Sequence, residues 1–119
     1  MSIVIYTDGA AKGNPGRGGY GVVLLSGVRR KELSGGFRLT TNNRMEIRAV
    51  VEGLASLPEN SSVTVYTDSM YVINTMTKNW KRNANLDLWK KLESMMTQLN
   101  HFLHLSLETG LTQQLSLVS

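Results

Sequence analysis

Residues 3–16 read IVIYTDGAAKGNPG, an apolar run that leads into an acid and then into a turn-rich loop. Residues with strand propensity followed directly by Asp8 predict a buried strand with a carboxylate at or near its end. Residues 63–69 read VTVYTDS and repeat the pattern, ending in Asp68 and a serine. Two such strands lying side by side would bring two carboxylates together. We therefore expect the chain to be organised around this pair of acids.

The composition is that of a globular chain. Its 119 residues are enough for a single domain over 1–119, and 41% hydrophobic residues can form a core. The chain has no cysteine, which excludes disulfides and thiolate metal sites. No basic-then-apolar leader opens it, and the longest aliphatic run, Val22 to Leu25, is too short to cross a bilayer. These features predict a soluble, cytoplasmic protein without a membrane partner.

The positive charge is concentrated in the first three quarters of the chain. The formal net charge is +4, and all 13 Lys and Arg residues lie at or before Lys91. A basic body suits a polyanionic partner such as nucleic acid. An ordinary solvated surface also explains a charge of this size, and composition alone favours that reading.

Periodicity and turn residues predict the order β-β-β-α-β-α-α-β, an α/β plan. The first three strands form an antiparallel meander with a bulge at Gly35–Gly36, and Asn42 or Asn43 caps the first helix, with Glu46 in its first turn. A right-handed crossover places the fourth strand beside the first. Ligand sites of open α/β sheets form at such carboxyl strand ends. The expected strands are 3–7, 21–25, 30–39, 62–67 and 102–107, and the expected helices are 42–57, 70–78 and 86–99.

Asp8, Glu46 and Asp68 are expected in one concave place. Three carboxylates there repel one another unless a cation neutralises them, and Mg²⁺ prefers carboxylate oxygens. Two such ions about 3.5–4 Å apart can activate a water and stabilise the leaving oxygen in phosphodiester cleavage. Taken singly, each acid has a local explanation as a turn former or a helix cap. The three acids taken together favour a metal site.

The motifs TDG, GNPGRGGYG, TTNNRME and TDSMYV occupy residues 7–9, 13–21, 40–46 and 67–72. Together they resemble the type 1 ribonuclease H family, over about residues 3–99. The resemblance implies a ribonuclease H-like fold, a mixed five-stranded sheet of three antiparallel strands and then crossover strands, flanked by helices. It also implies that the chain hydrolyses the RNA strand of RNA/DNA hybrids, leaving 5′-phosphate and 3′-hydroxyl ends. The implied cofactor is two Mg²⁺ ions, with Mn²⁺ as a substitute, and the expected state is a monomer.

The resemblance assigns roles to individual residues. Asp8, Glu46 and Asp68 match catalytic, metal-binding carboxylates, and Gly9 is counted with the metal site. Short amides suit the minor groove of a hybrid, where 2′-hydroxyls both donate and accept. The residues that match hybrid-contacting positions are Asn14, Asn42, Asn43 and Met70, together with Thr41 and Asn85, which match residues that hold a DNA-strand phosphate. For Asn85, a helix N-cap is an equally good explanation.

Trp80 stands among Lys78, Lys81 and Arg82, in a segment where many family members carry a longer basic insertion. A tryptophan among cations can stack on bases or line a backbone channel, which makes Trp80 a candidate substrate contact. It can equally anchor a solvated turn. The short segment predicts weaker hybrid affinity than in relatives that carry the insertion.

The resemblance stops at about Leu99, and residues 100–119 diverge. The family continues into a loop with a catalytic histidine and a last helix with a fourth metal-binding aspartate. If Gly110 aligns with the family's glycine, Leu111 stands in place of that histidine. No aspartate follows Asp87, and we expect the last helix to be missing. His104 reads as a strand-face residue, whereas Glu108 could turn toward the metals.

Two explanations fit this divergent tail. One is a natural variant with a reduced site, and the other is a changed reading frame or altered C-terminus. Either way, the sequence predicts reduced turnover. The alternative function is a catalytically impaired hybrid-binding domain with an incomplete metal site, or a subdomain completed by another chain.

Overall fold

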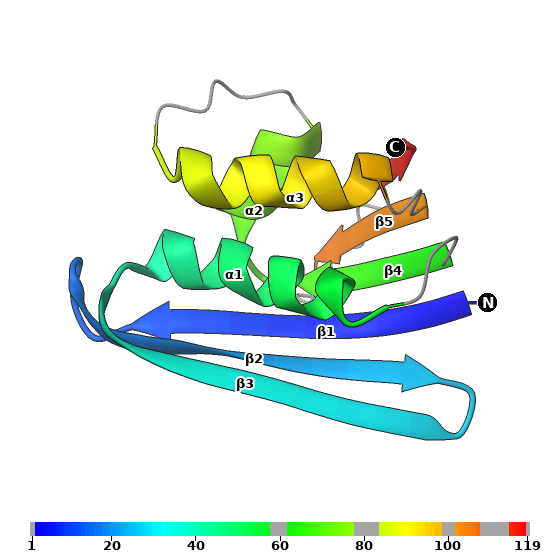
Figure 1. Cartoon of the computed structure of the whole chain (residues 1–119), viewed down its shortest axis with the longest axis horizontal. Coiled ribbons are helices and arrows are strands. Elements are labelled where there is room, and N and C mark those ends of the chain that lie inside the picture. The colour runs from blue at the N-terminus through cyan, green and yellow to red at the C-terminus, as the bar shows by residue number, and fades with distance from the viewer. Residues whose placement is uncertain (1, 58–61, 78–83, 99–101, 108–114, 119) are drawn as a thin grey trace.

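The computed structural model describes residues 2–57, 62–77, 84–98, 102–107 and 115–118, and for the last two segments it describes the backbone alone. The first eight elements follow the predicted order β-β-β-α-β-α-α-β, and one further strand comes after them (Figure 1). Its elements are β1 (Ser2–Ala11), β2 (Gly16–Ser26), β3 (Arg29–Thr40), α1 (Asn42–Ala55), β4 (Ser62–Thr67), α2 (Met70–Thr77), α3 (Leu86–Gln98), β5 (Phe102–Leu107) and β6 (Leu115–Val118).

The strands form one mixed sheet in the order β3-β2-β1-β4-β5-β6. β1, β2 and β3 are an antiparallel meander, and β4 is parallel to both β1 and β5. The helices α1, α2 and α3 gather on one side of this sheet (Figure 1). The α/β class, the meander and the crossover beside β1 are therefore confirmed. One strand is added to the five expected, because Leu115–Val118 pairs antiparallel with β5.

The core lies between the sheet and α1, with α3 packed on α1. Alternate residues of β1 and β4, such as Ile5 and Val65, point into it and are fully buried. Trp89 and Leu92 of α3 are also buried in the same cluster. Burying side chains of this size supplies the main driving force for folding. The packing fixes the register of β1 against β4. It therefore also fixes how the residues that follow the buried part of each strand lie relative to one another.

The start of α1 differs from the expectation. Thr41 is the N-cap, with an extended backbone, and its Oγ1 accepts a hydrogen bond from the backbone N–H of Arg44 at 3.2 Å. The assignment of the cap to Asn42 or Asn43 is therefore wrong, because both lie inside the first turn. Glu46 consequently falls in the second turn, where its side chain faces the sheet and not the solvent.

Two strand features also differ from the expectation. β1 does not end at Asp8 but continues to Ala11, because β2 pairs with it throughout that stretch. Its pairing with β4 stops at Tyr6 and Tyr66, so Asp8 lies where β1 loses one neighbour. Gly35–Gly36 pairs regularly, and the irregularity lies between Gly16 and Gly18. The bulge predicted at Gly35–Gly36 is therefore absent.

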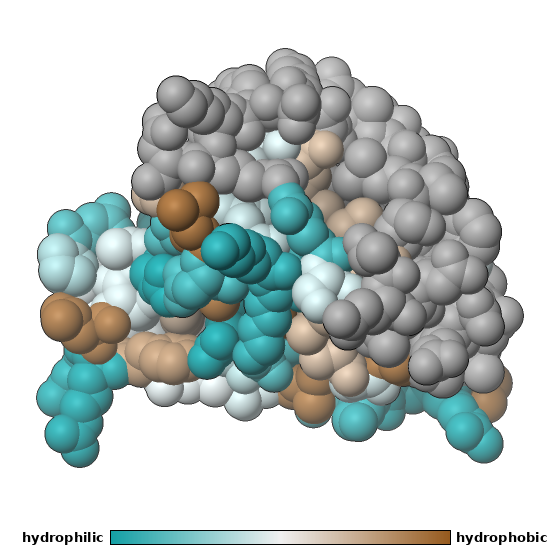
Figure 2. Space-filling view, turned by 45° about the horizontal axis from the view of Figure 1, so that its top comes forward, coloured by the Kyte–Doolittle hydropathy of each residue, from teal (hydrophilic) through white to brown (hydrophobic). Residues whose placement is uncertain are grey.

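Among the described residues, no helix is both long enough and apolar enough to cross a membrane. Hydrophobic residues on the described part of the face seen in Figure 2 are scattered among polar ones. The large exposed hydrophobic side chains are distributed over several strands, helices and a turn, and scattered residues of this kind are normal on protein surfaces. They include Val28, Leu39, Met70 and Leu86.

Candidate metal centre

Asp8, Glu46 and Asp68 come together beside the carboxyl end of β4. One carboxylate oxygen of each lies within 4.8 Å of the others. The register explains how the two aspartates meet, because each stands two residues beyond the paired Tyr6 and Tyr66. Glu46 reaches them from α1, which packs over β1. The structure therefore places the three predicted carboxylates in one cluster.

Glu46 is the buried member of the cluster, with a relative exposure of 8%. Its Oε1 accepts a hydrogen bond from the backbone N–H of Gly9 at 2.8 Å, and its Oε2 accepts one from Thr67 Oγ1 at 3.4 Å. α1 passes so close to Gly9 that no side chain would fit there, because a Cβ would lie 2.7 Å from the backbone nitrogen of Glu46. These contacts fix the carboxylate without neutralising it.

The electrostatics of the cluster are unfavourable to three negative charges. Burial, together with the neighbouring charges of Asp68 and Asp8, raises the pKa of Glu46 to about 7, although the two hydrogen bonds act in the opposite direction. Desolvation and like charges both disfavour an ionised carboxylate. A cation bound among the three acids would remove this penalty, and oxygen donors of this kind are the ligands that Mg²⁺ prefers.

Two surface hollows flank the acids, and Asp68 lines both. One, of about 720 Å³, is lined by Asp8 and Asp68 with residues of β1, β2 and β3. The other, of about 290 Å³, lies between the starts of α1 and α2. Six predicted site residues line this second hollow: Gly9, Asn42, Asn43, Glu46, Asp68 and Met70.

Asn14 and Asn42 hold the loop after β1 against the start of α1. Asn14 Oδ1 accepts a hydrogen bond from the backbone N–H of Asn42 at 3.1 Å, and Asn42 Oδ1 accepts one from the backbone N–H of Ala11. Both side-chain oxygens are therefore engaged within the chain. The amide nitrogens of these exposed residues have no partner among the described residues and remain available as donors.

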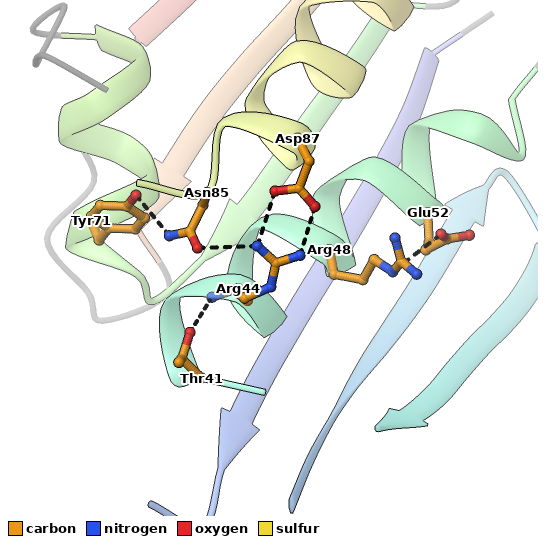
Figure 3. Close-up of polar contacts among 7 residues, drawn as sticks. All are labelled: Thr41, Arg44, Arg48, Glu52, Tyr71, Asn85 and Asp87. Carbon is orange, nitrogen blue, oxygen red and sulfur yellow. Dashed lines mark hydrogen bonds and ion pairs between the residues drawn. The ribbon is translucent and has the colours of Figure 1, made fainter. Parts of the chain in front are cut away.

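Thr41 and Asn85 do not line either hollow, but Arg44 connects them (Figure 3). The backbone N–H of Arg44 bonds Thr41, and its guanidinium donates to Asn85 Oδ1 at 3.3 Å and to both carboxylate oxygens of Asp87 at 3.0 and 2.7 Å. We call Arg44, Tyr71, Asn85 and Asp87 the α1–α3 network. The sequence motifs did not single out Arg44 or Asp87, because 43 residues separate them.

Trp80 and its basic neighbours lie outside the described residues, as do Glu108, Gly110 and Leu111. For His104 only the backbone is described, within β5. Thr67 is the contact to Glu46 that the sequence did not reveal. Its place in the repeated Tyr-Thr-Asp motif was the available signal, since the same motif precedes Asp8.

The fold and the site define an α/β domain whose central parallel strands lie beside a cluster of three carboxylates that could hold a metal ion. The profile of the RNase H family matches residues 1–111. A ribonuclease H of Syntrophus aciditrophicus is 57% identical over an alignment that covers 76% of this chain and 60% of the relative. A ribonuclease H of Rippkaea orientalis is 53% identical, over 81% of this chain and 68% of the relative. The chain belongs to the ribonuclease H family.

Solved structures agree with this assignment. The N-terminal RNase H domain of a Mycobacterium tuberculosis protein has a TM-score of 0.78 at 26% identity, covering 92% of this chain and 85% of that one. LC11-RNase H1, solved in complex with an RNA/DNA hybrid, has a TM-score of 0.76 at 27% identity, over 89% and 86%. Against some curated relatives, however, the chain spans well under two thirds of their length, 57% of the one from Trichodesmium erythraeum.

Proposed function

We propose that this chain is a metal-dependent endoribonuclease that hydrolyses the RNA strand of RNA/DNA hybrids. The observation that carries the proposal is the cluster of Asp8, Glu46 and Asp68, with carboxylate oxygens within 4.8 Å of one another. Relatives named ribonuclease H and a related structure bound to a hybrid support the choice of substrate. The products would carry 5′-phosphate and 3′-hydroxyl ends.

The cluster fits divalent cations, Mg²⁺ first and Mn²⁺ as a substitute. All three donors are carboxylates, and the raised pKa of Glu46 reflects burial and neighbouring negative charges, which a bound cation would offset. Asp8, Glu46 and Asp68 would hold the metal, with Gly9 at the site through its bond to Glu46. When bound, two such ions would activate a water and stabilise the leaving oxygen in phosphodiester cleavage.

The surroundings of the cluster suit a duplex. Asn42, Asn43 and Met70 line the hollow beside the acids, and Asn14 is tied to Asn42 across the loop. Exposed amides there would donate to and accept from the 2′-hydroxyls of the RNA strand. Thr41 and Asn85 would take a phosphate of the DNA strand. Trp80 is proposed as a further contact on the strength of its sequence context alone.

A second candidate is a hybrid-binding domain with little turnover. The sequence favours it at one point: if Gly110 aligns with the family's glycine, Leu111 stands where the resemblance implies a histidine. The two candidates share the binding surface and differ only in whether three carboxylates support hydrolysis.

Cleavage of a labelled RNA/DNA hybrid in Mg²⁺ or Mn²⁺ tests the proposal. The parent is expected to cut the RNA strand, and Asp8→Asn is expected to lower the rate by roughly 100-fold or more, the size of effect seen when an electrostatic catalytic group is lost. Asp8 is exposed, so its amide should fold normally.

Two outcomes contradict the hydrolase proposal in different ways. Unchanged cleavage by Asp8→Asn would show that the acids do not hold the catalytic metal. Tight hybrid binding by a parent that cleaves in neither metal would select the binding domain. Arg30→Met, which breaks the exposed Arg30–Glu32 ion pair of the β2–β3 hairpin, serves as a control and should cleave like the parent.

A further inference from the structure

Arg44 is the centre of a polar network that ties the start of α1 to α2 and α3. Figure 3 shows its guanidinium between Asn85 and Asp87, with Thr41 bonded to its backbone. The pair with Asp87 is bidentate, at 3.0 and 2.7 Å. Bidentate arginine–carboxylate pairs are the more directional kind of ion pair. One arginine therefore contacts both residues that are proposed to hold a DNA-strand phosphate.

These contacts determine which atoms of the Asn85 amide remain available. A guanidinium only donates, so the atom that faces Arg44 must be the amide oxygen. The amide nitrogen donates one hydrogen to Tyr71 Oη at 3.2 Å. It carries a second hydrogen, which has no partner among the described residues. The network thus leaves Asn85 with a free N–H donor, while its side-chain oxygen is turned toward Arg44.

Thr41 likewise keeps a hydrogen-bond donor that has no partner among the described residues. Its hydroxyl oxygen already accepts the backbone N–H of Arg44, while its own hydrogen has no acceptor among the described residues. A phosphate offers only acceptor oxygens to such groups. Two side chains held by one arginine therefore both present what a phosphate requires.

The backbone of Asn85 adopts an uncommon conformation at the start of α3. Its φ of 59° lies in the left-handed region, which asparagine tolerates better than most residues. Its carbonyl accepts the first backbone bonds of α3, from Leu88 and Trp89, so it stands at the N-cap position. Its side-chain oxygen nevertheless bonds Arg44, although a capping side chain normally accepts from the helix.

We propose that Arg44 and Asp87 are positioning residues for the DNA strand: their ion pair holds the Asn85 amide with its free N–H turned toward a backbone phosphate. The proposal rests on the proposed function, because it names how the same hybrid site recognises its DNA strand. Without Asp87, the guanidinium of Arg44 has no carboxylate to fix it. The Asn85 amide can then rotate, which would present its oxygen to the phosphate and repel it.

Hybrid binding with single neutral methylphosphonates scanned along the DNA strand tests this. Titrations in Ca²⁺, chosen to suppress cleavage, are expected to find one position at which the neutral group weakens binding by the parent. Asp87→Asn should weaken binding of the unmodified hybrid roughly three- to tenfold, the range for the net contribution of one ordinary hydrogen bond. The same variant should lose most of its sensitivity to the methylphosphonate, and Asp87→Glu should recover it.

Glu52→Gln is the matched control, because it breaks the Arg48–Glu52 pair on the same helix, at 3.6 Å, without touching Asn85. It should bind like the parent and keep the full methylphosphonate penalty. Thermal unfolding of each variant checks the fold.

Asp87→Asn that binds more weakly yet keeps the full penalty would show a purely structural role and overturn the inference. So would a parent with no sensitive position. A parent that binds but does not cleave contradicts the hydrolase proposal alone, since this test reads binding.

Discussion

The acid cluster and the α1–α3 network both gather polar side chains at the start of α1, but with opposite electrostatics. In the cluster, burial and like charges raise the pKa of Glu46 to about 7. In the network, the hydrogen bond to Arg44 lowers the pKa of Asp87 to about 2, and that of Arg44 is raised. Folding alone therefore accounts for the network, whereas the charges of the cluster disfavour folding, a cost that a bound cation would offset.

The difference shows how function can be inferred from each region. Unfavourable charges persist in a protein only where the surroundings impose them, and such places are often functional. The cluster points to its ligand directly. The charges of the α1–α3 network are already paired within the chain. The network therefore indicates a ligand only through the hydrogen-bond donors of Thr41 and Asn85 that have no partner among the described residues.

The largest expected effect comes from Gly9, which brings β1 close enough to hold Glu46. In Gly9→Ala, the new Cβ would meet the carbonyl of Met45 and lie 2.7 Å from the backbone nitrogen of Glu46, and backbone atoms cannot turn aside. The free energy of unfolding is expected to fall by about 3 kcal/mol, the upper range for overpacking. Urea unfolding measures it.

Gly21→Ala is the matched control on the neighbouring strand, opposite Asp8. A Cβ there meets no atom within 4 Å. Its unfolding free energy should stay within about 1 kcal/mol of the parent, because little beyond strand propensity changes. Equal losses in both variants would mean that the close approach of α1 does not position Glu46.

The second prediction concerns pH. The folded pKa of Glu46, about 7, lies above the ordinary value of 4.5, so the folded state holds this proton more tightly than the unfolded state. Stability therefore falls as the pH rises from about 4.5 through 7. Between pH 5 and 8 the metal-free protein should lose roughly 2 kcal/mol by this linkage. Urea unfolding at a series of pH values measures the slope.

Glu46→Gln separates charge from packing, because the amide oxygen can still accept from Gly9. The variant should show a flatter pH profile and exceed the parent in stability at pH 8, while losing cleavage. Adding Mg²⁺ should flatten the profile of the parent but not of the variant. A variant as pH-sensitive as the parent would assign the slope to another group.

The sequence predicted the sheet and the acids well, because their signals are local and repeated. The Tyr-Thr-Asp motif marks the same register position on β1 and β4, and a parallel pairing brings the two aspartates together. Glu46 was expected in the first turn of a helix packed on the sheet, and the structure places it in the second turn, on the buried side of α1. Each of these inferences needs only a period and a crossover rule.

Other features depended on partners far along the chain. Four residues that can cap a helix stand in a row at 40–43, so local preference could not select Thr41. The selection is tertiary, since Asn42 is engaged by Asn14 and Ala11. The extension of β1 beyond Asp8 likewise depends on β2, and β6 is a strand of four residues without a readable period.

The smallest expected effect is the loss of unfolding free energy when the Arg44–Asp87 ion pair of the network is removed. The folded pKa of Asp87 is below its ordinary value of 3.8, so its contribution is present above that pH and disappears as the pH falls toward 2. The Asp87 side chain is 64% exposed, which limits the value of the pair. Asp87→Asn should lower the unfolding free energy at pH 7 by about 0.5–1 kcal/mol, and less in high salt.

Glu52→Gln provides the comparison again, with an expected loss of about 0.3–0.5 kcal/mol for an (i, i+4) pair. The pH slopes of Asp87 and Glu46 have opposite signs, so acid and neutral titrations of the two variants separate the regions. A loss of several kcal/mol in Asp87→Asn would make the ion pair a requirement for folding. A small loss together with weaker binding to the hybrid would mean that the ion pair mainly orients Asn85.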